Sequence, residues 1–373
     1  MTHEQYSQIL PKRLILIALS LLPFCYTSWA QQEKIDDYVK SEMERNHIPG
    51  LAIAVVRNGQ VTLSRSYGRS NIELSTPVTS NSVFKLASLT KPITAMAIMV
   101  LVEEDKLALD SPVSKYLSNL PQRWAAVTIR QALSHTSGLA DYLRAPRWTW
   151  ASSWRQDFSH DEFIKFASEA PPDFEPGENI RYSNTGYYLL GMVIEKVTGK
   201  SYAQFLAERI FQPLDMQATR RDSSSEIIPN RVSGYEYEVA TLRNAQFTSD
   251  TWAYSEGGII SSIADLAKWD AALYSHKILK SSSIEQMWTP ARLNNGSLAI
   301  IGDNGAGKPN HYGFGWFITE QKGRKILLHG GNKPGFTSTF THFLDDHLTV
   351  IILSNNSFGT YPMSLAVADS LLK

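Results

Sequence analysis

Cysteine is almost absent from this sequence, with Cys25 the only one among 373 residues. It lies near the N-terminus, where Lys12 and Arg13 precede an apolar run, LILIALSLLPF, and the small residues of Ser28-Trp29-Ala30 follow. A basic start, a short apolar stretch and a small-residue cleavage site are typical of an export signal. We therefore expect residues 1–30 to be a cleaved signal peptide and the protein to be secreted or periplasmic, with an uncleaved membrane anchor as the alternative. The mature chain would contain no cysteine, which excludes disulfides, thiolate catalysis and cysteine metal sites.

An excess of charge of either sign is missing as well. The chain has 36 Lys and Arg against 36 Asp and Glu, and it contains no block of basic residues. Proteins that bind nucleic acids or anionic membranes normally carry such basic patches. We therefore expect a small-molecule substrate, no nucleic-acid partner and no membrane contact after signal cleavage, while the sequence leaves the oligomeric state open.

Strand-like segments lie near both ends of the chain. Near the start, two β-branched stretches flank Asn58-Gly59, a dipeptide typical of a tight hairpin turn. Near the end, the last two of three apolar stretches meet at Asp345-Asp346. Each end also carries a helical pattern of apolar residues. The predicted elements are a helix over 33–46, strands over 51–56, 61–67, 325–329, 336–343 and 348–354, and a helix over about 362–372.

Helix signals dominate the middle of the chain. In a capping box, a hydroxyl caps one helix amide and the residue three positions later bonds back to the cap. Such boxes occur at Thr128 with Gln131, Ser159 with Glu162, and Ser201 with Gln204. A further helix is expected from about Asn184 to Lys196, with Gly199 as its C-terminal stop.

These patterns predict an α+β fold. The two chain ends would build one antiparallel sheet flanked by helices, with a mostly helical subdomain inserted between them. Residues 31–85 and about 265–373 would form the α/β part, and about 86–264 the helical part.

Ser88 and Lys91 form the most suggestive pair of residues. They lie three positions apart where an extended segment gives way to the helical run after Thr90, so both would face the same side of the helix start. Pro92 fits the first helical turn, where its missing N–H costs little. A buried lysine with a lowered pKa can take the proton of a serine hydroxyl, and the helix N-terminus would favour the oxyanion formed on attack.

The same S-x-x-K spacing has less interesting explanations. Ser82 and Lys85 match it too, but in a strand these positions point to opposite faces and cannot cooperate. Ser88 could also be an ordinary helix cap followed by a surface lysine. On this motif alone, catalysis and capping remain equally open.

Two further motifs favour catalysis. Tyr182-Ser183-Asn184 precedes a predicted helix; a tyrosine near a lysine can shuttle protons, and an amide can hold a substrate carbonyl. His329-Gly330-Gly331 follows a predicted strand, where glycines let a substrate approach the strand edge. The alternatives are a buried tyrosine with an asparagine cap and a glycine-rich bulge with an incidental histidine.

In this order and at these separations, the motifs resemble the serine β-lactamase and penicillin-binding protein superfamily, and more closely its class C-like branch of β-lactamase-related hydrolases, D,D-peptidases, D-aminopeptidases and esterases. The resemblance covers most of the mature chain. It also includes LSHTSGL at 133–139, GGIISS at 257–262, YGFGW at 312–316 and the segment 329–338.

The resemblance implies a β-lactamase/penicillin-binding-protein-like fold and a serine acyl hydrolase without metal or organic cofactor. Ser88 would be the acylated nucleophile, Lys91 its activating partner and Tyr182 the proton shuttle. Substrate binding would fall to Asn184, His329, Gly330, Gly331 and Asn332, with the backbone N–H groups of Ser88 and Asn332 as the oxyanion hole. The substrate would be an ester or a small D-amino-acid amide or peptide first, a D-Ala-D-Ala-type peptide second and a β-lactam third. The alternative is a catalytically silent homologue that binds peptidoglycan peptides or a protein partner.

Two residues depart from the pattern of the branch. His329 replaces the usual lysine, and because an ordinary histidine has a pKa of about 6.5, we expect carboxylate binding there to strengthen as pH falls from 8 to 6. Lys333, four residues on, could supply the missing charge, although its spacing puts it outside the triad. Glu256, in place of a small residue, is expected to face solvent, with a carboxylate near the site as the alternative.

Aromatic residues are concentrated in the stretch RWTWASSWRQDF, which carries Trp148, Trp150 and Trp154. They could line a substrate cleft, but local core packing is the favoured interpretation. We likewise expect His135 to be a structural, hydrogen-bonded histidine.

Overall fold

The computed structural model describes residues 29–149, 153–305 and 307–372. Of the predicted signal peptide, only its last two residues belong to the described part, where they begin the first helix. The signal peptide therefore stays a prediction. Within the described ranges, no helix combines the length and the apolarity that crossing a bilayer requires.

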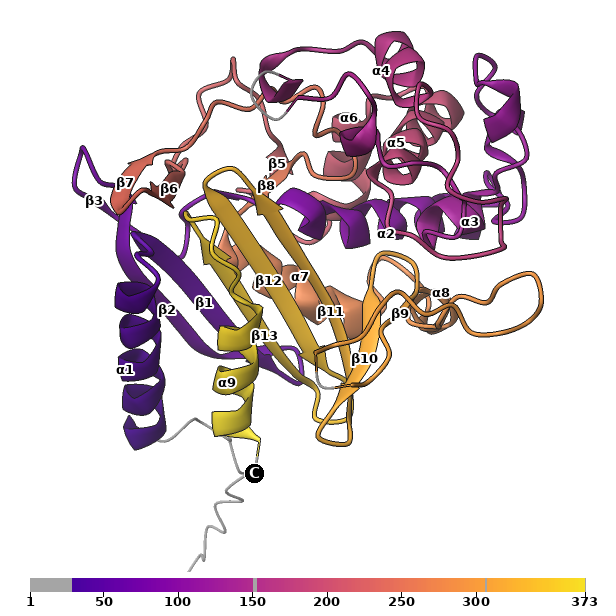
Figure 1. Cartoon of the computed structure of the whole chain (residues 1–373). Coiled ribbons are helices and arrows are strands. Elements are labelled where there is room, and N and C mark those ends of the chain that lie inside the picture. The colour runs from indigo at the N-terminus through magenta and orange to yellow at the C-terminus, as the bar shows by residue number, and fades with distance from the viewer. Residues whose placement is uncertain (1–28, 150–152, 306, 373) are drawn as a thin grey trace, which may run out of the picture.

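An antiparallel sheet of eight strands forms the centre of the molecule, with the order β3-β2-β1-β13-β12-β11-β10-β9 (Figure 1). Its strands come from both ends of the chain, as predicted. They are β1 (Gly50–Arg57), β2 (Gln60–Asn71), β3 (Thr76–Pro77), β9 (His311–Tyr312), β10 (Phe317–Gln321), β11 (Arg324–Lys333), β12 (Phe336–Phe343) and β13 (Leu348–Ser354).

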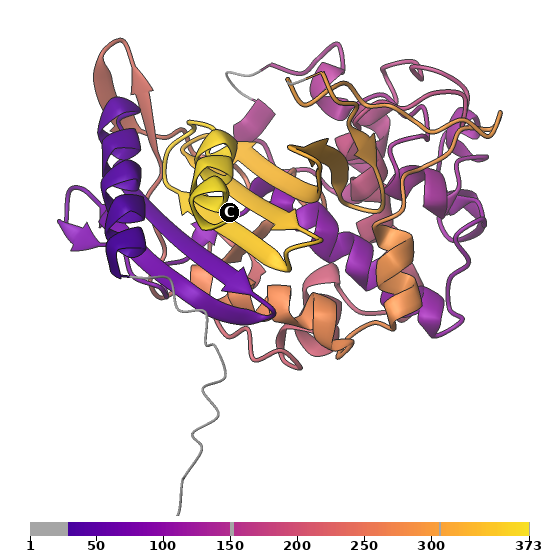
Figure 2. The same ribbon diagram turned by 90° about the horizontal axis from the view of Figure 1, so that it is seen from below.

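Helices cover both faces of this sheet. Helices α1 (Trp29–Arg45) and α9 (Tyr361–Leu371) lie on one face, and α7 (Ile263–Ser275) lies on the other (Figures 1 and 2). Strand β1 serves both layers because alternate side chains point to opposite faces. Leu51, Ile53 and Val55 pack with α1 and α9. Ala52, Ala54 and Val56 belong to the larger core on the side of α7.

The hairpin predicted at Asn58-Gly59 is confirmed. Asn58 has φ 51° and Gly59 has φ 71°, the left-handed conformations that a two-residue hairpin of this twist requires. Strands β12 and β13 have the predicted bounds. Strand β11 is longer than predicted, because the glycines after His329 stay extended and pair with β12, Gly331 lying opposite Ser338.

The middle of the chain is mostly helical. All three predicted capping boxes are present, starting α3, α4 and α6, and α5 ends at Gly199 in the left-handed conformation with φ 68°. The helices of this part are α2 (Thr90–Glu103), α3 (Ile129–Leu133), α4 (His160–Ala167), α5 (Asn184–Thr198) and α6 (Tyr202–Leu206), and α8 (Ser281–Met287) follows α7 further along. Two small sheets complete the fold, β4-β8-β5 from Phe84–Lys85, Ile259–Ser261 and Arg220–Arg221, and β6-β7 from Tyr235–Glu238 and Thr241–Asn244. The residue boundaries drawn between the two parts from sequence stay a prediction.

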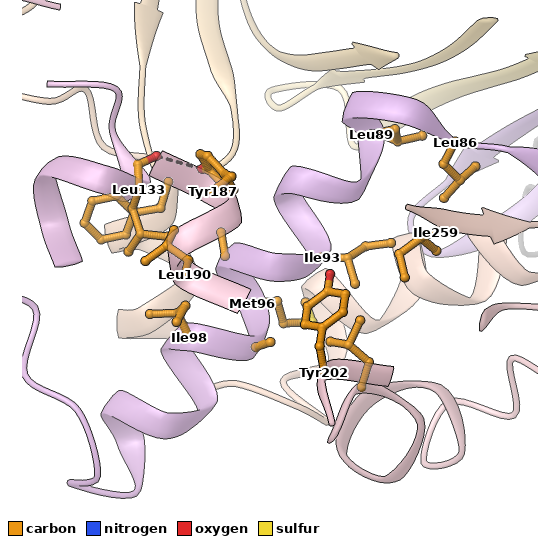
Figure 3. Close-up of a cluster of buried hydrophobic side chains, with 14 of the residues drawn as sticks. Leu86, Leu89, Ile93, Met96, Ile98, Leu133, Tyr187, Leu190, Tyr202 and Ile259 are labelled. Carbon is orange, nitrogen blue, oxygen red and sulfur yellow. Dashed lines mark hydrogen bonds between the residues drawn. The ribbon is translucent and has the colours of Figure 1, made fainter. Parts of the chain in front are cut away.

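Helix α2 runs through the interior of the helical part and is buried on all sides from Thr90 to Leu101. Figure 3 shows its residues Ile93, Met96 and Ile98 surrounded by side chains of other elements: Leu133 of α3, Tyr187 and Leu190 of α5, Tyr202 of α6 and Ile259 of β8. The Tyr187 hydroxyl donates to the Leu133 carbonyl at 2.7 Å, which joins α5 to α3. An apolar helix enclosed in this way is a rigid base for whatever lies at its N-terminus.

Candidate active site

Ser88 lies at a sharp corner between β4 and α2. Strand β4 ends at Lys85, a single turn of 3-10 helix, η1, covers Ala87–Leu89, and α2 begins at Thr90. Ala87 has φ 47°, in the left-handed region, so the chain reverses direction directly before Ser88. Pro92 is the third residue of α2, where a backbone N–H has no partner within the helix. The strand-to-helix corner predicted at Ser88 is confirmed.

Lys91 is fully buried beneath Ser88 and makes three hydrogen bonds. Its Nζ lies 3.0 Å from Ser88 Oγ, 2.7 Å from Asn184 Oδ1 and 2.9 Å from the Glu256 carbonyl oxygen. The last two partners can only accept, so they use two N–H bonds of Lys91. In the neutral amine, the lone pair is then left for the Ser88 hydroxyl proton.

Burial determines the protonation of Lys91. Desolvation lowers the pKa of Lys91 from 10.5 to about 7, while the nearby carboxyl groups of Glu256 and Asp141 oppose this shift. A substantial fraction of Lys91 is therefore a neutral amine near pH 7, which an exposed lysine is not.

Tyr182 reaches the same serine from the other side. Lys91 Nζ lies 4.8 Å from the centre of its ring. Burial raises the pKa of Tyr182 well above 10, while its interaction with the Ser88 side chain opposes this shift. Tyr182 is therefore a neutral phenol at physiological pH, able to donate and accept a proton but not present as a resting phenolate.

Asn184 is fixed by Asp141, a residue that the motifs did not single out. Asn184 Nδ2 donates to Asp141 Oδ2 at 2.9 Å, and Asp141 also accepts from the backbone N–H of Leu143. With its amide nitrogen held by Asp141, Asn184 must present Oδ1 to Lys91. Asp141 directly follows the LSHTSGLA segment, and its proximity in sequence to that motif was the only available signal.

Strand β11 passes close to Ser88 because Gly331 has no side chain. A Cβ at Gly331 would lie 2.0 Å from the Leu86 carbonyl oxygen and 2.8 Å from the Ser88 nitrogen. Ser338 of β12 strengthens this junction by donating its hydroxyl to the Leu86 carbonyl at 2.6 Å. Asn332, the next residue of β11, is exposed. The predicted site residues on η1, α2, α5 and β11 thus converge on one location.

A family model described as Beta-lactamase matches residues 35–369. The chain belongs to the beta-lactamase family. Penicillin-binding protein 4* of Bacillus subtilis (strain 168) is 34% identical over 334 residues, which cover 85% of this chain and 70% of that protein. Protein flp of Staphylococcus aureus (strain MW2) is 26% identical, and the match spans 63% of its length.

Solved structures agree with this family and its fold. The octameric penicillin-binding protein homologue from Pyrococcus abyssi superposes with a TM-score of 0.78 at 27% identity, over 91% of this chain and 77% of that one. A D-stereospecific amidohydrolase from Streptomyces sp. superposes with a TM-score of 0.72 at 25% identity, over 88% and 94% of the two chains. Family and fold together support a serine hydrolase of the β-lactamase and penicillin-binding protein superfamily.

His329 of this beta-lactamase family member is buried, with 1% of its surface exposed. Its Nε2 lies 2.9 Å from the Tyr312 hydroxyl and its Nδ1 lies 2.7 Å from the Gly330 carbonyl oxygen. Burial, helped by the charge of Lys91, lowers the pKa of His329 to about 3. The expectation that His329 gains charge between pH 8 and 6 is therefore wrong, because desolvation and the charge of Lys91 outweigh the hydrogen bond to the Gly330 carbonyl, which favours the protonated ring.

Glu256 does not face solvent, so that expectation is also wrong. Only 2% of Glu256 is exposed, and its Oε1 accepts from the Tyr142 hydroxyl at 2.8 Å. Its Oε2 is enclosed and has no hydrogen-bond partner among the described residues. Its main-chain carbonyl accepts a hydrogen bond from Lys91 Nζ. Burial raises the pKa of Glu256 to about 7, partly offset by the charge of Lys91.

Lys85 is separate from this site, as the strand argument predicted. Its Nζ lies 3.3 Å from an Asp222 carboxylate oxygen and 3.2 Å from the Thr248 hydroxyl. Ser82 instead accepts from the backbone N–H of Thr79. Ser88 and Lys91 are therefore the S-x-x-K pair whose side chains meet.

His135 and the tryptophan stretch supply packing. His135 Nδ1 accepts from the Ser183 backbone N–H at 3.2 Å, and its ring lies 4.3 Å from that of Tyr182, as expected for a structural histidine. Trp148 is buried and its ring lies 5.9 Å from that of Trp252, in agreement with local core packing. Trp150 and the side chain of Trp154 lie outside the described residues. In the described part of the chain, His, Asp and Glu side chains form no cluster that could hold a metal ion.

We predict that Gly331→Ala slows acylation of Ser88 by about 100-fold, because η1 or β11 must shift by about 1 Å to admit the methyl group. The rate is measured as the release of p-nitrophenol from p-nitrophenyl acetate in the first turnover. Gly359→Ala is the matched control, since a Cβ there meets nothing within 4 Å. Equal rates for the two variants would contradict the role given to Gly331.

Proposed function

We propose that the protein is a serine acyl hydrolase that cleaves an ester or amide through a covalent acyl-enzyme on Ser88. One observation carries the proposal. Lys91 is buried with two of its N–H bonds fixed by carbonyl acceptors, so the lone pair of the neutral amine is directed at Ser88 Oγ. A lysine placed only for packing or for binding a partner has no need of this arrangement.

Acylation follows from these contacts. Lys91 takes the proton of the Ser88 hydroxyl as Oγ attacks the substrate carbonyl carbon, and the carbonyl oxygen becomes an oxyanion. The backbone N–H groups of Ser88 and Asn332 stabilise that oxyanion. Tyr182 gives its hydroxyl proton to the leaving oxygen or nitrogen and recovers one from the Lys91 ammonium. The bond to the leaving group breaks, and the acyl group stays on Ser88.

Deacylation reverses the proton transfers. A water molecule loses a proton to the Lys91 and Tyr182 pair while its oxygen attacks the ester carbonyl. The second tetrahedral intermediate then collapses, Ser88 Oγ regains its proton, and a carboxylic acid leaves. Neither step requires a metal or an organic cofactor.

The substrates expected first are small esters and D-amino-acid amides or peptides. The resemblance in fold to a protein titled a D-stereospecific amidohydrolase supports amides of this kind. Relatives named penicillin-binding proteins support D-Ala-D-Ala-type peptides as the second class. A neutral His329 supplies no cation beside the leaving group, which places β-lactams third.

The experiment for this proposal is covalent labelling of Ser88. We expect incubation with p-nitrophenyl acetate, D-phenylalanine amide and a fluorescent penicillin to give turnover or an adduct with at least one reagent, located on Ser88 by peptide mass spectrometry. Ser88→Ala should abolish both signals. Folded protein that shows neither turnover nor adduct with any of the three would indicate the alternative, a silent homologue that only binds peptides or a partner.

Activity should rise with pH through a midpoint of about 7, because Lys91 acts as a base only when neutral and burial lowers the pKa of Lys91 to about 7. Below the midpoint Lys91 is protonated and kcat/KM falls, and above the midpoint Lys91 is neutral and kcat/KM reaches a plateau. We expect Glu256→Gln to move the midpoint lower, since it removes a carboxylate that raises the pKa of Lys91. Profiles of kcat/KM for p-nitrophenyl acetate between pH 5.5 and 9 measure both effects, and a flat wild-type profile would exclude Lys91 as the base.

Export belongs to the proposal as well, on the basis of the basic, apolar and small-residue order of residues 1–30. Expression with the full N-terminus in a Gram-negative host should give a mature protein in the periplasm that begins at or near Gln31. Intact-mass measurement of the purified protein decides this, and a chain that keeps residues 1–30 would indicate the uncleaved anchor.

A further inference from the structure

Lys333 is a second buried lysine near the nucleophile, and it has no assigned role. Only 5% of the residue is exposed, yet its amino group makes no hydrogen bond or ion pair with any residue of the described chain. The amino group of Lys333 instead lies over an aromatic face, with Nζ 5.3 Å from the centre of the Trp252 ring. Burying a charged amine without a partner is costly, so an anion that reaches Lys333 would offset that cost and favour the protonated amine.

The nearby acids do not satisfy Lys333. Asp222 is occupied by Lys85 at 3.3 Å and by Arg231 at 2.9 Å. Glu256 acts on Lys333 through its charge, but no oxygen of Glu256 comes within ion-pair distance. The Lys333 amino group keeps a small solvent exposure, unlike the fully enclosed polar atoms of the described chain.

The position of Lys333 on β11 relates it to the reacting atoms. His329, Gly331 and Lys333 alternate along the strand, so all three lie on the same face, opposite Phe340, Ser338 and Phe336 of β12. Gly331 is the residue that contacts the Ser88 nitrogen. Lys333 therefore lies about 7 Å along the strand from that contact in one direction, and His329 lies as far in the other.

The two directions correspond to the two halves of the substrate. Tyr182, which protonates the leaving group in the proposed reaction, has its ring 6.3 Å from the His329 ring. The leaving group therefore departs on the His329 side. The half that remains attached to Ser88, the acyl group, extends towards Lys333 and Trp252.

We propose that Lys333 binds a carboxylate carried by the acyl half of the substrate, which makes the enzyme selective for anionic acyl groups. This inference rests on the proposed function and specifies its substrate class. The flat face of Trp252 and the Lys333 ammonium together suit a short aliphatic chain that ends in a carboxylate.

The test compares each anionic acyl group with its uncharged isostere. Succinyl, glutaryl and adipoyl p-nitroanilides are each paired with the compound in which the terminal carboxylate is a carboxamide. Each compound is measured both as a substrate and as a competitor of p-nitrophenyl acetate hydrolysis. We expect at least one chain length for which the carboxylate is preferred about 10-fold or more, as a charge-assisted hydrogen bond requires.

Variants of Lys333 then locate the preference. Lys333→Met should reduce the preference for the carboxylate to less than about threefold, mainly through KM or the inhibition constant. Hydrolysis of p-nitrophenyl acetate should be retained in this variant. Lys333→Arg should keep much of the preference. Lys268→Met is the control, because Lys268 on α7 is a lysine already paired with Asp215, and the preference should survive there. No preference at any chain length, or an equal preference in wild type and Lys333→Met, overturns the inference.

The pH dependence of the preference ratio gives a second readout that a purely structural role would not change. Burial lowers the pKa of Lys333 to about 7, with Lys85 acting in the same direction and Asp222, Glu256 and Asp250 opposing it. The ratio of rates for the carboxylate and carboxamide compounds should therefore be highest below pH 7, where Lys333 is protonated, and should fall above it. The requirement for neutral Lys91 affects both compounds of a pair equally, so it cancels in the ratio. If none of p-nitrophenyl acetate, D-phenylalanine amide and the fluorescent penicillin is turned over or leaves an adduct on Ser88, the proposed function fails and this inference with it. Turnover without carboxylate preference overturns the inference alone.

Discussion

The desolvation of Lys91 is the constraint on which the rest of the site depends. An exposed lysine keeps its proton at neutral pH and cannot serve as a base, whereas burial lowers the pKa of Lys91 to about 7. Burial is achieved because α2 is enclosed from its first turn onward by α5, α6 and β8, as Figure 3 shows for its apolar residues. The apolar packing of the helical part therefore sets the chemistry at its surface.

Hydrogen bonds from three separate parts of the chain then orient Lys91. Asn184 begins α5 and is held by Asp141, the Glu256 carbonyl precedes β8, and Ser88 lies on η1. Strand β11 closes the arrangement from the sheet side, with Gly331 against the Ser88 nitrogen. The sheet and the helical part meet at this junction, which explains why the reactive serine lies between them rather than within either one.

The charged groups around the nucleophile are distributed unevenly. Towards His329 the environment is aromatic and neutral, with Tyr312 and Tyr182 around a desolvated imidazole. In the other direction lie Lys333 and Glu256, two buried ionisable groups that are not paired with one another. This asymmetry is the basis of the proposal that the substrate carries its charge in the acyl half.

Much of the fold followed from local sequence signals, because capping boxes, the Asn58-Gly59 turn and period-two strands are determined by neighbouring residues. The pairing of Ser88 with Lys91 followed in the same way, since a spacing of three at a helix start places both side chains on one face. Local sequence could not determine burial, which depends on residues distant in the chain. Four features depend on how β11, β8 and the segment around residues 141–142 pack together. They are the inward orientation of Glu256, the neutral state of His329, the role of Asp141 in holding Asn184, and the unpaired amino group of Lys333. The sequence by itself thus determined which groups could react, and the tertiary structure decided their protonation and their partners, because both depend on how far each group is removed from water.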